Sequence, residues 1–230
     1  MKNSELILAI LFWTFLVADC ILMTEGLHEY RIYTKTLLVP ILLIGIYTTS
    51  QETKHRKSKV ITTLAFFFCF LGDFFLLSDD DKSYFILGLS SFLLAHLFFI
   101  VFFLRLKKIS NKYRLFLSGI SALVFSYVGV LLFLIWKDVT LQNLQIPVVV
   151  YAFILGLMLI AAVHTINNKS IQKLSRYFFI PGAVLFILSD SLLALYKFAI
   201  TFRYGNILVM VTYAGALFLL YLGVMRFLKK

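Results

Sequence analysis

The sequence has few of the residues that mark water-soluble, disulfide-rich or multidomain proteins. Charged residues make up 14% of its 230 residues, and there are only three prolines and two cysteines. Both cysteines, Cys20 and Cys69, lie in apolar runs, so we expect small buried residues and not a disulfide or metal framework. No polar stretch is long enough to form a second, soluble domain.

Several catalytic signatures are also missing. There is no Gly-x-Ser-x-Gly elbow, which argues against an acyl-serine hydrolase. No two histidines stand four positions apart, so an intramembrane zinc hydrolase would lack its usual ligands. The sequence contains no phosphate-binding P-loop, so the chain is not itself an ATPase.

What the sequence has instead is long apolar runs. Hydrophobic residues make up 61% of the chain, and a run of about 18 or more of them is typical of a membrane helix. We therefore predict an all-α, polytopic membrane protein with eight transmembrane helices, in which residues 1–230 form a single integral membrane domain. The expected spans are residues 6–23, 33–49, 60–77, 84–104, 114–136, 146–164, 178–198 and 205–227.

The positive charge gathers on one side of the predicted membrane. Sixteen of the 22 lysines and arginines fall at the termini and in the loops at 50–59, 105–114 and 165–176. Cytoplasmic loops carry the excess of Lys and Arg, so both termini are predicted to be cytoplasmic, which requires an even number of spans. This pattern suits a multi-pass protein of a bacterial inner membrane or an equivalent membrane. It also explains the net charge of +11 without nucleic-acid binding.

Two aspartates lie inside apolar runs with similar surroundings. Asp73 lies in Phe-Cys-Phe-Leu-Gly-Asp-Phe-Phe-Leu-Leu, and Asp190 lies in Leu-Phe-Ile-Leu-Ser-Asp-Ser-Leu-Leu. An ionisable group in a span costs about 3 kcal/mol or more at the bilayer centre, so it usually faces a cavity or a partner. Because burial favours a protonated carboxyl, such a pair suits acid–base catalysis, with one group as acid and the other as base. The alternative is that each aspartate only caps or hydrogen-bonds a neighbouring helix.

The spacing of these residues suggests an internal repeat. The two aspartates are 117 residues apart in the third and seventh spans, and adding 117 to His96 in the fourth span gives Tyr213 in the eighth. This correspondence is the expected sign of two parallel four-helix halves, although apolar sequences also align by chance. Both aspartates are expected in the outer half of the membrane, where their carboxyls could share one layer.

Other polar residues in or near the spans have several possible roles. Lys35, at the outer start of the second span, could meet a phosphate headgroup, pair with an outer carboxyl or extend to the interface. His96 could orient an aspartate, relay a proton, ligate a metal or hydrogen-bond between helices. Tyr151 and Tyr213 could point hydroxyls into a cavity, but aromatic packing is the usual role of such residues.

Three features on the outer side are expected to have no part in a site. Asp19 lies near the outer end of the first span and is expected to be solvated there. His28 is expected to be a loop residue without a function. The acidic run Asp79–Lys82 is most simply a solvated turn.

A series of short motifs runs through residues 30–220 and resembles one family. The motifs are Thr34-Lys35 followed by Pro40; Gly72-Asp73; Gly88 through Ser91-Phe92 to Ala95-His96; Pro147 through Tyr151; and Gly182-Ala183 through Phe186, Ser189-Asp190 and Leu193-Ala194. In this order, on these spans, they make the chain similar to the YhhN family of membrane proteins, the lysoplasmalogenases. The family often has proline directly after the lysine, where this chain has Thr36, which concerns the local shape at the start of the second span.

The resemblance implies an eight-span helical fold and hydrolysis of the vinyl-ether bond of lysoplasmalogens. The products would be a fatty aldehyde and glycerophosphocholine or glycerophosphoethanolamine. No metal or organic cofactor is expected, and the partners would be the lysophospholipid substrate and membrane lipids. The sequence does not indicate an oligomeric state.

The resemblance also implies roles for particular residues. The two aspartates thought to be catalytic in the family match Asp73 and Asp190. Beyond the resemblance, our own hypothesis is that His96 and Tyr213 orient them or the attacking water and that Lys35 attracts the headgroup phosphate. The side chains expected to line the substrate pocket are Tyr151 and Ser189.

A proton-coupled transporter or a non-catalytic lipid-binding protein is the alternative. Intramembrane carboxyls also serve proton coupling, and a repeat in two halves is typical of carriers. Such a carrier would have helices broken by Gly or Pro at corresponding positions of the two halves. The three prolines do not pair in that way.

Overall fold

The computed structural model describes residues 3–49, 53–78, 81–107 and 113–230, and within these residues it is helical and without strands. Among the described residues, eight helices are long and apolar enough to cross a membrane, which confirms the predicted fold class and the predicted number of spans. The spanning helices are α1 (Asn3–Thr24), α2 (Lys35–Thr49), α3 (Arg56–Phe75), α4 (Lys82–Leu106), α5 (Arg114–Leu141), α6 (Gln145–His164), α8 (Ile180–Phe198) and α9 (Gly205–Leu228). Short helical segments join or extend them: η1 (His28–Tyr33), η2 (Leu76–Ser78), η4 (Thr165–Asn167), α7 (Gln172–Leu174) and the π-helix η5 (Ser175–Phe179).

Several helices extend beyond their predicted ends. α3 begins at Arg56 instead of residue 60, and α5 continues to Leu141 instead of ending at residue 136. The seventh span begins at Gln172, because α7 and η5 lead directly into α8. An apolar run marks only the part of a helix inside the hydrocarbon, whereas polar and basic residues can continue the helix into the interface.

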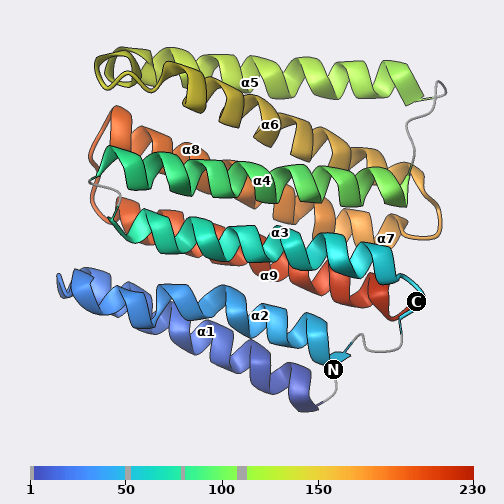
Figure 1. The fold of residues 1–230 in the computed structure, drawn as a ribbon. Coiled ribbons are helices and arrows are strands. Elements are labelled where there is room, and N and C mark those ends of the chain that lie inside the picture. The colour runs from blue at the N-terminus through green and yellow to red at the C-terminus, as the bar shows by residue number, and fades with distance from the viewer. Residues whose placement is uncertain (1–2, 50–52, 79–80, 108–112) are drawn as a thin grey trace.

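The helices lie side by side, with chain neighbours antiparallel (Figure 1). The hairpins α3–α4 and α8–α9 form the centre of the bundle. α1 and α2 flank them on one side, α6 packs against α4 and α8, and α5 lies outermost against α6. Only 11% of the span residues of α5 are buried, against 50% in α9. α5 is therefore the span most exposed to surrounding lipid, and α9 is the most shielded.

Small residues allow the central helices to approach closely. A Cβ atom added at Gly182 of α8 would lie 2.9 Å from the Leu220 side chain and 3.3 Å from the Ala216 carbonyl oxygen. Large aromatic residues fill the space beside these contacts, including Phe102 and Phe179, whose ring centroids are 5.6 Å apart. Because the interior is filled in this way, polar side chains near it are held in defined positions.

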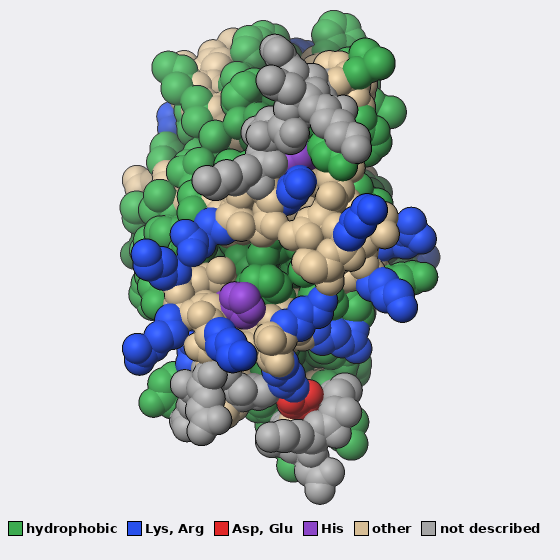
Figure 2. All heavy atoms as spheres, turned by 90° about the vertical axis from the view of Figure 1, so that its right-hand side faces the viewer, with side chains coloured by type: hydrophobic (Ala, Val, Ile, Leu, Met, Phe, Trp, Pro, Cys, Tyr) green, Lys and Arg blue, Asp and Glu red, His purple; other side chains and the backbone are tan. Residues whose placement is uncertain are grey.

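Both ends of the described chain lie at the same end of the bundle (Figure 1), and we call the opposite end the distal end. Figure 2 looks onto the end with the termini and shows many Lys and Arg side chains with little acidic surface. The structure thus gathers the basic loops on one face, as the charge pattern predicts. The assignment of this face to the cytoplasm rests on the positive-inside rule and stays a prediction.

Candidate active site

Asp73 is buried in the distal part of α3, where two side chains from other helices contact its carboxylate. The Tyr213 hydroxyl of α9 donates a hydrogen bond of 2.7 Å to Oδ2. Nζ of Lys35, the first residue of α2, lies 3.9 Å from Oδ1. Asp73 is only 1% exposed, so its ion pair with Lys35 is shielded by the bundle. Lys35 therefore pairs with a carboxyl, one of the alternatives that the sequence leaves open.

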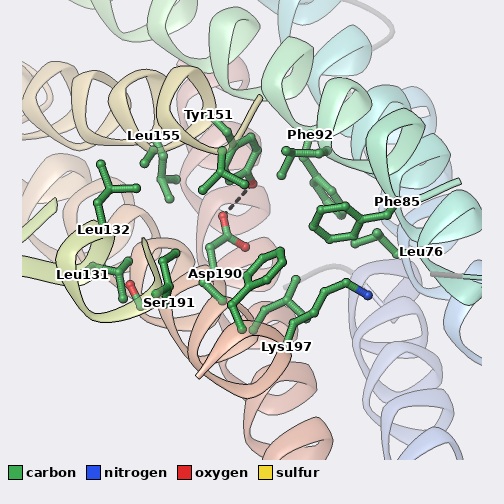
Figure 3. A pocket seen from close by; sticks show the side chains of 17 residues that line it. Leu76, Phe85, Phe92, Leu131, Leu132, Tyr151, Leu155, Asp190, Ser191 and Lys197 are labelled. Carbon is green, nitrogen blue, oxygen red and sulfur yellow. Dashed lines mark hydrogen bonds between the residues drawn. The ribbon is translucent and has the colours of Figure 1, made fainter. Parts of the chain in front are cut away.

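Asp190 of α8 has a tyrosine and a histidine as neighbours. The Tyr151 hydroxyl of α6 donates a hydrogen bond of 2.7 Å to Oδ2, drawn as a dashed line in Figure 3. Nε2 of His96 in α4 lies 3.0 Å from the Tyr151 oxygen and 3.7 Å from Oδ2 of Asp190. The Asp190 side chain is 15% exposed, so it is more open to the space around it than Asp73.

The direction of these hydrogen bonds assigns the proton on His96. Because the Tyr151 hydroxyl donates to Asp190, its oxygen must accept from Nε2–H of His96. Nδ1 is buried without a hydrogen-bond partner in the described part of the chain.

The contacts cross between the two central hairpins. Asp73 of the first hairpin is bonded by Tyr213 of the second, and Asp190 of the second lies near His96 of the first. Between them lies Phe186, whose ring centroid is 4.7 Å from that of His96 and 5.5 Å from that of Tyr213. His96 and Tyr213 are the pair that the 117-residue spacing relates. A reciprocal arrangement of this kind is what two related hairpins facing each other would produce, and it supports the repeat.

Both aspartates line one cavity of about 300 Å³, which we call the polar cavity. A hollow of this size has room for several water molecules or part of a ligand. Its polar lining residues are His28, Arg31, Lys35, Asp73, Ser189, Asp190, Asn206 and Tyr213. The Ser189 hydroxyl donates a hydrogen bond of 3.0 Å to the Val209 carbonyl, which ties α8 to α9 beside the cavity. The structure thus brings together the carboxyl pair that the sequence predicts.

A second, narrower hollow of about 60 Å³ begins at Asp190 and lies between α4, α5, α6 and α8, and we call it the apolar cavity (Figure 3). Most of its walls are aliphatic or aromatic side chains, among them Phe85, Leu89, Leu131, Leu132, Ile135, Val148 and Leu155. The residues that line both cavities are Leu76, Phe92, Asp190 and Leu193. Asp190 therefore lies where a polar hollow and an apolar hollow meet.

Gly72 explains how Phe92 reaches this meeting point. A Cβ atom at position 72 would lie 2.5 Å from the Phe92 ring, so only glycine allows α4 to place that ring so close to α3. The ring also contacts Tyr213 edge-on, with centroids 5.7 Å apart. In the Gly72-Asp73 motif, the glycine thus allows close packing of α3 against Phe92 of α4 directly beside the carboxyl of Asp73.

The prediction for Asp19 was wrong. Its carboxylate is fully buried and accepts hydrogen bonds from Nε and Nη2 of Arg31 at 3.2 and 3.1 Å. It also accepts a hydrogen bond of 2.8 Å from the Thr34 hydroxyl. The position of Asp19 at a helix end did not show that η1 folds back over it and brings Arg31 with it.

Sequence reasoning also missed two residues of the polar cavity. His28, expected to have no function, and Arg31 both line it from η1. The one available signal was the pair of opposite charges, Asp19 and Arg31, on the same predicted side of the membrane.

Of the acidic run Asp79–Lys82, Asp79 and Asp80 lie outside the described residues. The Asp81 side chain caps α4 by accepting a hydrogen bond of 2.7 Å from the Ser83 amide.

Comparison with known proteins places the site in a family. The YhhN family matches residues 30–224. The chain belongs to the YhhN family. Both aspartates and the tyrosine and histidine residues that contact them fall inside the matched segment. No solved structure matches the chain.

Two curated relatives are each named lysoplasmalogenase, one from Mycobacterium bovis and one from Mycobacterium tuberculosis. Each is 32% identical to this chain over 114 residues. The matched stretch covers 50% of this chain and 41% of each relative, so the similarity spans less than half the length of these relatives.

Proposed function

We propose that this member of the YhhN family hydrolyses the vinyl-ether bond of lysoplasmalogens, releasing a fatty aldehyde and a glycerophospho-base. The observation that carries the proposal is the position of Asp190 between the polar and apolar cavities. A lysoplasmalogen is divided in the same way, with glycerol and a charged headgroup on one side of the vinyl ether and a hydrocarbon chain on the other. The names of the mycobacterial relatives support the same substrate class.

The surroundings of the apolar cavity suit a substrate that arrives from the membrane. One wall of this cavity is formed by Leu131, Leu132 and Ile135 of α5, the least buried of the eight spans. A long alkenyl chain exceeds the volume of the cavity, so its far end would extend toward lipid beside α5. Entry from the side would then bring the vinyl ether to Asp190 without taking the chain through water.

Asp190 is placed to act as the general acid. Its proton would add to the outer alkene carbon of the vinyl ether, with the double-bond electrons forming the new C–H bond. The product is an oxocarbenium ion that is delocalised onto the ether oxygen. Tyr151, which already donates to Oδ2, would stabilise the carboxylate left behind. His96 would hold Tyr151 in that orientation.

Asp73 is placed to act as the anion and base. Lys35 stabilises its ionised form, and Tyr213 fixes its orientation. The carboxylate would stabilise the oxocarbenium ion and accept a proton from the attacking water, which adds to the cationic carbon. The hemiacetal then breaks its bond to the glycerol oxygen. That oxygen takes the proton that Asp73 received, and the Asp190 carboxylate removes the hydroxyl proton as the aldehyde forms, which restores both carboxyls. The same division between two carboxyls serves glycoside hydrolysis, which passes through a similar cation.

The test is aldehyde release by the purified protein in lipid vesicles. We expect aldehyde from a lysoplasmalogen and none from the matched 1-alkyl lysophospholipid, which lacks the double bond that accepts the proton. A 1-acyl lysophospholipid is the second control, because an esterase of broad specificity would release its fatty acid. Aldehyde release that is equal in the wild type and in both Asp73→Asn and Asp190→Asn would end the catalytic assignment.

Proton-coupled transport and non-catalytic lipid binding are the competing outcomes of this test. The seventh span contains the π-helix η5, whereas α3, its counterpart in the repeat, is a regular α-helix over Arg56–Phe75. Carriers built from repeats usually have an interrupted helix at the corresponding position of both halves. Here only one of the two corresponding helices is interrupted, which favours a hydrolase over a carrier. Proton-dependent uptake without aldehyde would support a transporter, and intact lipid recovered after long incubation would support a binding protein.

A further inference from the structure

A third hollow of about 440 Å³, which we call the vestibule, lies next to the polar cavity. It is lined by residues at the end of α1, in η1, at the end of α8 and at the start of α9, with Arg203 and Tyr204 among them. Two residues, His28 and Asn206, line both the vestibule and the polar cavity. The three hollows are therefore neighbours: Asp190 lines both the apolar and the polar cavity, and His28 and Asn206 line both the polar cavity and the vestibule.

Arg31 lies on the polar-cavity side of this second junction and is held by a buried carboxylate. Asp19 accepts from Nε and Nη2, which fixes the plane of the guanidinium group. No described residue accepts from Nη1, and 15% of the side chain is exposed where it lines the polar cavity. An arginine fixed on one edge with donors remaining on the other is suited to bind an anion such as phosphate.

Arg203 lies on the vestibule side and adds a positive charge to this region. Its guanidinium carbon is 4.9 Å from the centre of the Tyr204 ring. No described carboxylate forms an ion pair with it, whereas Arg31 is paired with Asp19 and Lys35 with Asp73. The junction is the region where His28 and Asn206 line both hollows. Arg31 lines the polar-cavity side of it and Arg203 lines the vestibule side, and of these two guanidinium groups only that of Arg31 is paired with a described carboxylate.

We propose that the junction between the polar cavity and the vestibule is a phosphate subsite, in which Arg31, His28 and Arg203 hold the headgroup phosphate of the lysolipid. This inference rests on the proposed function and names the part of the substrate that each region holds. With the vinyl ether at Asp190, the glycerol backbone occupies the polar cavity and the phosphate reaches the His28 end of it. Lys35, which the sequence analysis also assigns to the phosphate, lines the polar cavity and is paired with Asp73.

The experiment measures binding of two lipids that the protein cannot cleave. A 1-alkyl lysophosphatidylethanolamine has the phosphate, and the corresponding 1-alkylglycerol has the same chain and glycerol without it. Affinities for the purified protein in detergent micelles are compared for the wild type, Arg31→Gln and Arg203→Gln. Arg176→Gln is the matched control, because Arg176 is exposed in η5 at the opposite end of the bundle.

We expect the wild type to bind the phospholipid at least about tenfold more tightly than the alkylglycerol. Arg31→Gln and Arg203→Gln should each lower the affinity for the phospholipid about tenfold and leave the affinity for the alkylglycerol unchanged. The Arg176→Gln protein should match the wild type with both lipids. Arg31→Gln leaves the buried Asp19 without its cation, so a loss of fold is possible for that variant. Arg31→Lys keeps the charge without the two-pronged geometry and should lose less affinity, and Arg203→Gln lies outside the ion pair.

If the wild type binds the two lipids with equal affinity, the subsite is overturned. It is also overturned if Arg31→Lys and Arg203→Gln both bind the phospholipid as tightly as the wild type does.

Inorganic phosphate serves as a competitor to identify the source of the anion. It should displace the phospholipid and not the alkylglycerol; phosphate binding that leaves phospholipid affinity unchanged would contradict a headgroup site. Because neither lipid contains a vinyl ether, failure of the subsite can be told apart from failure of the proposed hydrolysis.

Discussion

The two aspartates have similar sequence surroundings but different neighbours. Asp73 is almost fully buried and lies 3.9 Å from the ammonium group of Lys35, while Asp190 remains partly exposed and lies 3.7 Å from the imidazole of His96. Each accepts one tyrosine hydroxyl at 2.7 Å, so the tyrosines do not account for the difference. The difference lies in the second partner, a lysine for Asp73 and a histidine for Asp190, and in access to the cavities.

This comparison suggests how a repeated motif acquires two functions. The carboxyl with a lysine beside it has a cation that stabilises its ionised form, and the carboxyl at the meeting point of two cavities is placed to hand a proton to a substrate. The crossed contacts, Tyr213 to Asp73 and His96 to Asp190, place parts of both hairpins at each carboxyl. A change in one hairpin should therefore affect both carboxyls, which the following predictions test in order of expected size.

Replacement of the proposed acid should have the largest effect. Asp190→Asn keeps an acceptor for Tyr151 but removes the transferable proton, so kcat for aldehyde release should fall by about 10²–10⁴-fold. The measurement is aldehyde formation at saturating lysoplasmalogen, with thermal unfolding as a check on the fold. Asp138→Asn in α5, a residue outside both cavities, is the matched loss of a carboxyl and should behave as the wild type. Retention of activity by Asp190→Asn would remove Asp190 from the chemistry.

The buried ion pair gives the second prediction. Lys35→Met leaves Asp73 without its counter-ion and should lower stability by about 3 kcal/mol, because removal of one partner strands a buried charge. Asp73→Asn combined with Lys35→Met should recover most of that stability without recovering activity. The measurement is the thermal unfolding midpoint of the four proteins in a double-mutant cycle. A double variant no more stable than Lys35→Met would show that the two side chains do not act as a pair.

The third prediction compares the two tyrosines directly. Tyr151→Phe removes the donor that stabilises the carboxylate formed in the acid step, so it should lower kcat about tenfold or more. Tyr213→Phe removes a donor from a carboxylate that Lys35 still neutralises, and should lower kcat less. Steady-state kinetics of both variants in one preparation would measure the ratio. A larger effect of Tyr213→Phe would reverse the assignment of acid and base.

The smallest expected effect concerns the chain. Leu132→Trp adds bulk to the α5 wall of the apolar cavity, and Leu132 does not line the polar cavity. We expect KM to rise by a few-fold for long alkenyl chains and to change less for short ones, with kcat nearly unchanged, because only substrate binding is altered. Leu123→Trp on an exposed part of α5 is the control. An equal change for all chain lengths would contradict the placement of the chain beside α5.

Most of the fold could be predicted from sequence because a membrane limits the choices. Apolar runs of sufficient length give the number of spans, and the excess of Lys and Arg gives the face on which the loops lie. The aspartates stood out because ionisable groups are rare in spans. The helix ends, such as those of α3 and α5, were less predictable, because the apolar run ends at the membrane interface whereas the helix continues beyond it.

The partners of the aspartates were harder to predict than the aspartates themselves. The Tyr213 hydroxyl bonds a carboxylate that lies 140 residues earlier in the chain, and no local pattern records such a contact. Asp19 and Arg31 were missed for another reason: η1 folds back over the end of α1, and a short polar segment between spans resembles an ordinary loop. The tyrosine contact and the position of η1 both depend on how the helices pack against one another, and the distribution of apolar residues along the sequence does not reveal that packing.

The most direct test of the account is hydrolysis in D₂O with isotopic analysis of the aldehyde, trapped as it forms. If a carboxyl delivers a solvent-exchangeable proton to the outer alkene carbon, the aldehyde released by the wild type will carry one deuterium on the carbon next to the carbonyl, and Asp190→Asn will form it far more slowly. Aldehyde without deuterium at that carbon, or lysoplasmalogen recovered intact from the wild type, would contradict the account.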